Sequence, residues 1–148
     1  MDLFQSLQIS ASGLQSQRTV ISVIAENMAN AQTTRTEEGG PYLRKRAILS
    51  PVSLPQGSPF FELLARKAAP EAMGVQVQEV VEDSEGVKTI YDPSHPDADE
   101  NGLLYLPNVN LMEEMVALMA ASRIFEANVA AFNAAKSMTL KSLEIGNR

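Results

Sequence analysis

Apolar side chains near the start of the chain recur at steps of three and four residues, the spacing of one face of an α-helix. Asp2, followed by Gln5 three residues later, predicts a capped N-terminus. The pattern is lost within residues 27–34, so we expect a helix over about residues 1–31. Four residues of this stripe are predicted to form a seam against a partner helix: Leu7, Leu14, Ile21 and Met28.

The same spacing returns at the other end of the chain. Asn110 is a favourable N-cap, and Glu113 lies three residues later as its capping-box partner and as an anion near the helix dipole. The pattern continues to Ile145 and Gly146, which predicts a helix of roughly 50 Å within residues 110–148, packed against the first helix. Its predicted seam consists of Leu118, Phe125, Val129 and Phe132.

Each predicted helix also carries a second apolar stripe. A single partner helix covers one stripe only, and the sequence predicts no third long helix. Either the middle of the chain folds over the second stripes, or other copies or relatives of the chain cover them, and we favour the latter. The predicted subunit contacts are Ile9, Val20, Val23, Val116, Ile124, Ala127 and Ala131.

The middle of the chain, residues 32–109, contains all eight prolines. Because proline interrupts helices and both proline and glycine favour turns, this segment separates two uninterrupted helical ends. We therefore predict an α+β fold, in which two long terminal helices form a coiled-coil inner domain and a small, loop-rich β domain is inserted between them.

Alternation of apolar and polar residues predicts strands in this middle segment. Residues 75–81 and 87–91 alternate on either side of the turn sequence EDSEG, so a hairpin is expected at about 75–91. Residues 42–49 form a candidate additional strand. Residues 50–72 carry no periodic signal and are expected to form a loop.

Composition excludes several classes of protein. A formal charge of −6 and an isoelectric point near 4.8 oppose binding to nucleic acid or anionic membranes. With no cysteine, the chain has neither disulfides nor thiolate metal sites. The N-terminus lacks the basic and long apolar regions of a cleavable signal peptide, and no stretch approaches about 18 uninterrupted apolar residues.

The one chemically dense segment is DPSHPDADENG, residues 92–102. It contains the first half of an EF-hand loop, formed by Asp97, Asp99, Asn101 and Gly102. The twelfth position of that motif is Asn108 instead of glutamate, which opposes a calcium site. His95 and Asp92 are a candidate acid-base pair, but no nucleophile motif accompanies them. We favour a stiff polar connector to the C-terminal helix and predict no catalytic, cofactor or metal site.

Several segments resemble the bacterial flagellar axial proteins, the group of rod, hook and hook-associated proteins. The segment SASGLQSQRTVISVIAENMANAQTT, residues 10–34, is similar to the N-terminal signature of this group. TTRTEEGGPYLRKR, YDPSHPDADENG and PNVNLMEEMVALMAASRIFEANVAAFNAAKSM narrow the resemblance to basal-body rod proteins. Leu103 and Leu104 depart from the usual aromatic residue followed by valine, and Phe125 replaces the usual tyrosine. The residues assigned to the family motif are Asn27, Asn30, Thr33 and Thr34.

The resemblance implies a structural, non-enzymatic subunit of the proximal rod without a cofactor. It implies a location in the periplasm-spanning part of the basal body, reached through the flagellar type III export apparatus without signal cleavage. The implied partners are copies of the chain and rod subunits of the FlgB, FlgF, FlgG and FliE kinds, with no nucleic acid and no direct membrane insertion. The alternatives are another rod or hook protein, a weak calcium-binding adaptor built on the acidic segment, or a small hydrolase using its histidine.

Overall fold

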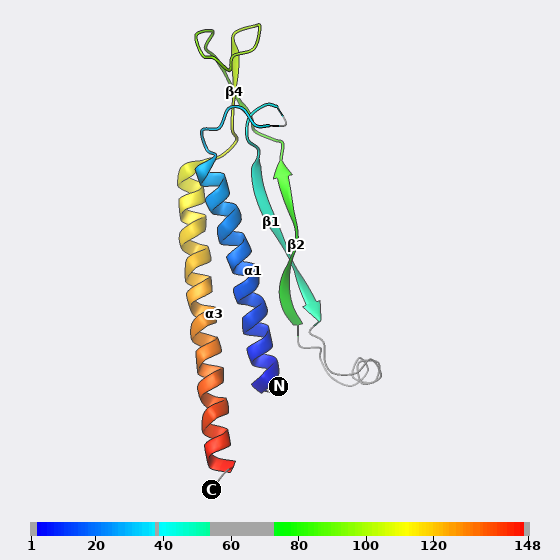
Figure 1. Cartoon of the computed structure of the whole chain (residues 1–148), viewed down its shortest axis with the longest axis vertical. Helices are drawn as coiled ribbons and strands as arrows, with labels where there is room; N and C mark the ends of the chain where they lie inside the picture. The colour runs from blue at the N-terminus through cyan, green and yellow to red at the C-terminus, as the bar shows by residue number, and fades with distance from the viewer. Residues whose placement is uncertain (1–2, 38, 54–72, 147–148) are drawn as a thin grey trace. The chain divides into compact units, whose positions relative to one another are not determined.

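A computed structural model describes residues 3–37, 39–53 and 73–146 and contains two long helices with a strand-bearing segment between them in the sequence (Figure 1). This arrangement confirms the predicted α+β class. The predicted cap at Asp2 and residues 54–72 of the predicted loop lie outside the described residues. In chain order the elements are α1 (Leu3–Ala29), β1 (Arg44–Ser53), β2 (Met73–Asp83), β3 (Lys88–Tyr91), β4 (Leu103–Leu106) and α3 (Leu111–Gly146).

The chain divides into two compact units. Unit 1 comprises Met1–Thr19, Leu49–Gln78 and Ser122–Arg148. Unit 2 comprises Val20–Ile48 and Glu79–Ala121. The division crosses both helices and the first two strands, so each unit combines helical and extended residues.

The start and end of α3 agree with the prediction from the sequence. The Asn110 side-chain oxygen accepts a hydrogen bond from the Met112 N–H at 3.1 Å, which satisfies one of the free donors of the first turn. The Asn110 amide in turn donates to the Glu113 carboxylate at 2.9 Å. No proline or glycine interrupts the helix before Gly146, where it ends.

β1, β2 and β3 overlap the three predicted strands, but the predicted hairpin at 75–91 is wrong. Residues 50–53, expected in a loop, belong to β1, and β4 has no counterpart in the prediction. Among the described residues, β2 pairs with β1 and β3 pairs with β4, giving two separate two-stranded sheets. The carbonyl groups of Asp83 and Glu85, at the expected turn, accept hydrogen bonds from the Asn108 side chain, each at 2.6 Å. The turn therefore leads away from β2, and β3 pairs with a later strand instead.

The acidic segment 92–102 is the loop that joins β3 to β4. The antiparallel register places Lys88 opposite Leu106 and Tyr91 opposite Leu103, so the loop closes directly after Tyr91. Its base is closed by the Asp92 N–H, which donates to the Gly102 carbonyl at 2.9 Å. The predicted connector to the C-terminal helix is therefore a hairpin loop, and the actual connection to α3 follows β4.

In unit 1, small residues of α1 lie close to α3 and β2. A Cβ atom at Gly13 would lie 3.1 Å from the side-chain amide nitrogen of Asn128, so glycine permits this close approach. The Ser16 hydroxyl donates to the Val75 carbonyl at 2.9 Å, and the Ser12 hydroxyl accepts from the Val75 N–H at 3.2 Å. These hydrogen bonds pair both backbone groups of Val75 with side chains of α1.

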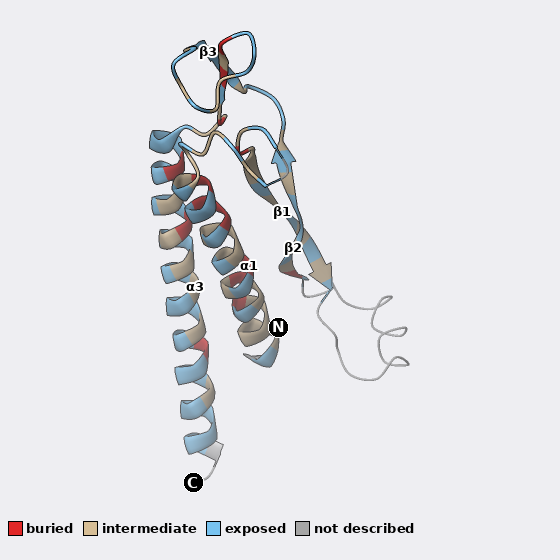
Figure 2. Cartoon of the chain, turned by 45° about the horizontal axis from the view of Figure 1, so that its top comes forward, coloured by how far each residue is buried: buried red, intermediate tan, exposed pale blue. Residues whose placement is uncertain are grey.

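Buried residues are few among the described ones and gather mainly in unit 2 (Figure 2). The buried apolar side chains of this unit are Val23, Ile24, Tyr42, Leu104 and Ala121. In α3, by contrast, most side chains are exposed. Within the described residues, its segment Leu111–Ile145 is the one helix long and apolar enough to cross a membrane, and 6% of its most apolar window is buried.

Candidate interaction site

Two polar side chains, Asn27 and Glu114, are the largest that the fold buries completely among the described residues. Each is 1% exposed, although Glu114 carries a carboxyl group. Asn27 lies near the end of α1 and Glu114 in the first turn of α3, and the Asn27 amide donates to the Glu114 carboxylate at 3.2 Å. Because buried polar groups are costly unless hydrogen-bonded, these two residues require a complete set of partners.

The partners of Asn27 are Lys45 on β1, Tyr42 just before β1, and Glu114. Its side-chain oxygen accepts from the Lys45 N–H and from the Tyr42 hydroxyl, both at 2.9 Å. Its amide nitrogen donates to the Lys45 carbonyl at 2.9 Å as well as to Glu114. An asparagine side chain offers two donor hydrogens and one oxygen with two lone pairs. All four are used, which fixes both the amide orientation and the position of β1 beside α1.

Glu114 is balanced by a cation from β1. The Arg44 Nε donates to its carboxylate at 2.6 Å, a charge-assisted hydrogen bond in which the arginine side chain stays 27% exposed. The Arg44 N–H also donates to the Asn108 side chain at 2.8 Å, and Asn108 holds the end of β2 as described above. The network therefore joins the end of α1, the start of β1, the end of β2 and the start of α3 within unit 2.

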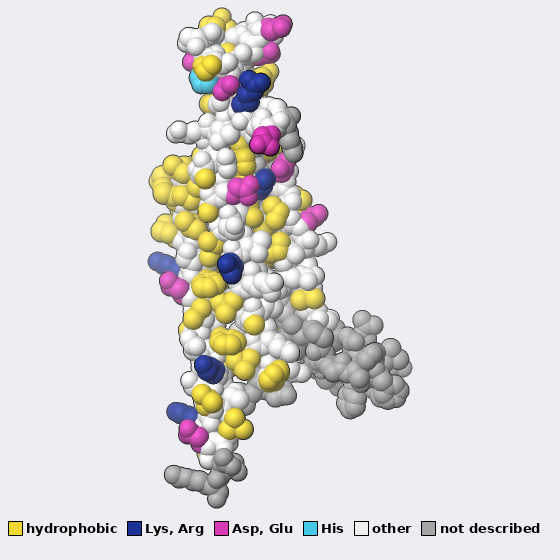
Figure 3. Space-filling view, viewed as in Figure 1, with side chains coloured by type: hydrophobic (Ala, Val, Ile, Leu, Met, Phe, Trp, Pro, Cys, Tyr) yellow, Lys and Arg dark blue, Asp and Glu magenta, His cyan; other side chains and the backbone are white. Residues whose placement is uncertain are grey.

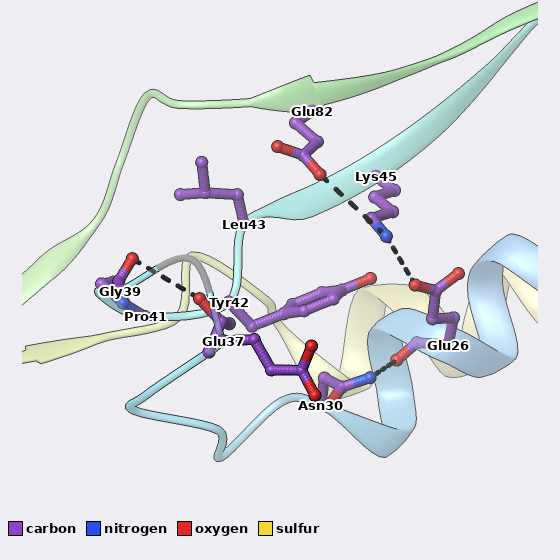
Figure 4. A pocket seen from close by; sticks show the side chains of 10 residues that line it. Glu26, Asn30, Glu37, Gly39, Pro41, Tyr42, Leu43, Lys45 and Glu82 are labelled. Carbon is purple, nitrogen blue, oxygen red and sulfur yellow. Dashed lines mark hydrogen bonds and ion pairs between the residues drawn. The ribbon is translucent and has the colours of Figure 1, made fainter.

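A pocket of about 530 Å³ lies next to this network (Figure 4). Lys45 extends into it, with its Nζ 2.6 Å from the Glu26 carboxylate and 4.0 Å from that of Glu82. The Lys45 Nζ also lies 5.6 Å from the centre of the Tyr42 ring. Glu37 forms a further part of the wall. The pocket thus presents three carboxylates and one ammonium group, a charge pattern suited to a cationic partner group.

The protonation states of this pocket follow from its contacts. The hydrogen bond with Glu26 raises the pKa of Lys45 above its usual value. Burial, followed by the charge of Glu26, raises the pKa of Tyr42. At neutral pH the lysine is therefore charged and the tyrosine carries the hydroxyl proton that it donates to Asn27.

Polar groups of the loop at 92–102 form hydrogen bonds within the loop and with Thr34. The Asp97 N–H donates to the His95 Nδ1 at 3.1 Å, and the Asp97 carboxylate accepts from the Thr34 hydroxyl at 2.7 Å. The Asp92 carboxylate accepts two hydrogen bonds from Ser94, which lower its pKa. In the described part of the chain, no group of three or more His, Asp or Glu residues could hold a metal ion.

Comparison with known proteins identifies the family of this chain. The chain is 42% identical over 151 residues to the flagellar basal-body rod protein FlgC of Borreliella burgdorferi, covering 98% of both chains. It is 39% identical to the protein of the same name in Bacillus subtilis and 34% identical to that in Salmonella typhimurium, with 99% coverage in each case. The chain belongs to the FlgC family of flagellar basal-body rod proteins. It is a structural subunit of the rod in the flagellar basal body.

Residues 100–145 of this FlgC family member also match the family described as flagellar basal body rod FlgEFG protein C-terminal. That match covers β4 and almost all of α3. The similarity to these relatives extends over nearly the whole chain, so it spans the segments that carry α1, β1 and α3. Assembly with other components of the flagellar rod follows from membership of the family.

The four residues assigned to the family motif all lie in unit 2, and they hold the turn after α1. Asn27 is the centre of the buried network. The Asn30 amide donates to the Glu26 carbonyl at 2.9 Å, and its oxygen accepts from the Thr33 hydroxyl at 3.1 Å. Thr34 donates to Asp97 in the hairpin loop. In this FlgC family member the motif therefore positions the chain between α1 and β1.

The predicted seam residues of the family member are covered less than expected. Seven of them are half-buried, and Val129 is 36% exposed. The fully buried positions of α1 are instead Ser10, Gly13, Ser16, Val23, Ile24 and Asn27. Small and polar residues occupy this face because β2 lies close to α1 in unit 1 and β1 lies close to it in unit 2. The pairing of the seam residues with one another stays a prediction.

The predicted subunit-contact residues fall into three groups. Val116 and Ile124 are 60% and 48% exposed, and Ala127 and Ala131 are exposed as well. Ile9 and Val20 are half-buried. Val23 is 8% exposed, so the chain itself already covers it and it offers little surface to another subunit. The contacts of the first two groups remain a prediction.

Sequence reasoning missed Glu114, Arg44, Tyr42 and Lys45 as members of one network. One signal was available: Glu114, Leu118, Ala121 and Phe125 continue the three-four spacing of the inner face of α3. A carboxylate at such a position requires a buried partner. The identity of that partner could not be read from the spacing, because Arg44 lies seventy residues away in the sequence.

Proposed function

We propose that this FlgC family member forms part of the proximal rod and transmits torque as a mechanical, non-catalytic element. Its helices bury their exposed apolar faces against neighbouring rod subunits. The observation that carries the proposal is the exposure of α3: Met112 is 67% exposed, Val116 60% and Met119 59% (Figure 3). Soluble proteins rarely leave a continuous apolar face of this kind uncovered.

Burial of these side chains supplies a driving force for assembly. Each Å² of apolar surface removed from water contributes about 25 cal/mol, and a large side chain contributes roughly 1.5–3 kcal/mol when fully covered. Loss of translational and rotational freedom offsets part of this gain. Several such residues on each of many subunits are therefore needed for a stiff, long-lived contact, which suits a shaft built of repeated chains.

The length and apolar character of α3 also fit a membrane-spanning helix. Membership of a family of rod proteins favours other subunits as the occupant instead of lipid. We propose as partners copies of the chain and rod subunits of the FlgB, FlgF, FlgG and FliE kinds. We further propose that the chain reaches them through the flagellar type III export apparatus without removal of a signal peptide.

The buried network gives unit 2 a defined shape for this role. Asn27, Arg44 and Glu114 tie two helices to a strand through hydrogen bonds of fixed geometry, so a force applied to one element is passed to the others. The acidic pocket beside the network is a candidate recognition surface for a cationic group of a neighbouring subunit.

Site-directed cross-linking tests the proposal, because the chain has no cysteine of its own. Val116→Cys places a unique thiol on the exposed face of α3. After labelling with a benzophenone maleimide and irradiation of isolated basal bodies, we expect a cross-link to another rod subunit. Glu100→Cys, at the exposed tip of the hairpin loop, is the matched control and should give none. Cross-linking to lipid alone, or a Val116→Cys variant that assembles without any cross-link, would refute the proposal.

A further inference from the structure

We propose that three methionines at the start of α3 form an oxidation-sensitive patch that controls whether the subunit can assemble; this rests on the proposed function. The methionine patch consists of Met112, Met115 and Met119, which are 67%, 37% and 59% exposed. All three lie in unit 2. At about 100° per residue they share an arc of about 60° on the helix surface, so their sulfur atoms face the same side.

The composition of the chain directs two-electron oxidants to its methionines, and the patch holds the two most exposed of those described. There is no cysteine and no tryptophan to compete, and three of the seven methionines lie within eight consecutive residues. Thioether reactivity depends on access. Met28, which is half-buried in α1, is shielded by comparison. Outside the patch, Met73 on β2 is 55% exposed and Met138 on α3 is 54% exposed.

The chemical step is the transfer of one oxygen atom. The methionine sulfur attacks hydrogen peroxide, an S–O bond forms, the O–O bond breaks, and water leaves. The sulfur is oxidised by two electrons to the sulfoxide, and the peroxide is reduced by two electrons. Methionine sulfoxide reductases return the thioether, with one enzyme for each sulfoxide epimer.

Oxidation changes what the patch can bind. A methionine side chain is unbranched and adaptable and fits irregular apolar surfaces. The sulfoxide is polar, so its oxygen loses its water when the face is covered and finds no donor among apolar neighbours. Each sulfoxide at the centre of a contact is expected to weaken association by about tenfold. Oxidation therefore acts on the free subunit, because assembly covers the patch.

The first measurement maps the modification. The purified full-length chain is treated with hydrogen peroxide, and peptides are analysed by mass spectrometry over time. We expect sulfoxide at Met112 and Met119 first, at Met73 and Met138 at similar or slightly lower rates, at Met115 next and at Met28 last. Oxidation of Met28 ahead of the patch would overturn the inference.

The second measurement tests the consequence by sedimentation velocity of the same full-length chain. Self-association should weaken at least tenfold after oxidation and recover after treatment with both sulfoxide reductases. The variant M112L/M115L/M119L keeps the apolar surface and should associate equally before and after peroxide, whereas the control M73L should remain sensitive. Circular dichroism confirms that each sample keeps its helices.

The two proposals fail in different ways. If the unoxidised chain associates and oxidation leaves its association unchanged, the inference is overturned and the proposed function stands. If the triple leucine variant is as sensitive to peroxide as the unmodified chain, the patch is not the responsible site. If the unoxidised chain shows no association at any concentration, copies of the chain do not cover the patch and the inference is overturned, whereas cross-linking of Val116→Cys decides the proposed function.

Discussion

The most informative perturbation of this chain is Asn27→Asp, which changes one NH₂ group to oxygen within the buried network. In the native protein that nitrogen lies 2.9 Å from the Lys45 carbonyl oxygen and 3.2 Å from the Glu114 carboxylate. The substitution keeps the size of the side chain and the acceptor that serves Tyr42. It replaces two favourable donor contacts with two oxygen-oxygen contacts, so the effect isolates hydrogen bonding and charge from packing.

The magnitude follows from these contacts. Two hydrogen bonds are lost at about 1 kcal/mol each. Two like charges about 3.2 Å apart repel by roughly 5 kcal/mol at an effective dielectric constant of about 20, and Arg44 offsets part of this. We expect the free energy of unfolding to fall by about 3–5 kcal/mol at pH 7. That is a large fraction of the roughly 5–15 kcal/mol typical of folded domains.

The same change has a defined pH dependence. Burial and the charge of Glu114 raise the pKa of the new carboxyl in the folded state above its unfolded value of about 3.9. The penalty is therefore smallest below about pH 4, where the carboxyl is protonated in both states and can donate one hydrogen bond. It grows as the pH rises through the unfolded pKa towards the raised folded pKa.

Urea unfolding followed by circular dichroism at pH 7 and pH 4 measures both effects. The control is Asn30→Asp, which alters a half-buried asparagine of the same motif whose amide donates to the Glu26 carbonyl. It should cost about 1 kcal/mol or less. A loss below 1 kcal/mol for Asn27→Asp, or a gap to the unmodified chain that does not narrow at pH 4, would show that the network does not hold the fold.

Three further results are expected. Gly102→Ala should destabilise the hairpin by about 1–3 kcal/mol, because Gly102 has φ of +74° and a Cβ there would lie 2.9 Å from the Tyr91 ring. Gly40→Ala is the control, with φ of +84° and open space around it, and should lower the free energy of unfolding less in the same urea titration. Lys45→Gln should reduce the pH dependence of the free energy of unfolding at alkaline pH. Because the pKa of Lys45 is raised in the folded state, its pairing with Glu26 stabilises the fold fully below about pH 10.4. That stabilisation is lost as the pH rises through the folded-state pKa. Calorimetric titration with calcium should give no binding heat, and a measurable heat would reinstate the acidic loop as a metal site.

The helices of this protein could be predicted from the sequence because their signal is local. Asn110 and Glu113 mark the start of α3 through contacts within a few residues, and the helix extends from there to Gly146. β1, β2 and β3 could be located for the same reason, since alternation is a property of neighbouring residues. The short strand β4, LLYL, has no alternation and was therefore missed. Which strands pair is not local, and the turn sequence EDSEG suggested a hairpin that does not form.

The candidate site could not be predicted, because its residues are far apart in the sequence. Taken one at a time, none of them indicates a shared network. Asn27 lies where the helical pattern is lost, Arg44 is one of three adjacent basic residues, and Glu114 directly follows the predicted capping-box residue Glu113. Only the fold shows that all three meet. The face of α1 that is buried is also less apolar than its seam, so hydrophobic spacing alone selected a neighbouring stripe.

Side chains of α1 occupy backbone hydrogen-bonding groups of β1 and β2 that a further strand could otherwise use. Asn27 occupies both the N–H and the carbonyl of Lys45, and Ser12 with Ser16 occupies both backbone groups of Val75. A two-stranded ribbon otherwise presents open edges to which a foreign strand can add. At these positions the edge is already closed, so crowded copies of the chain cannot stack there as a growing sheet and remain free to associate through their helices.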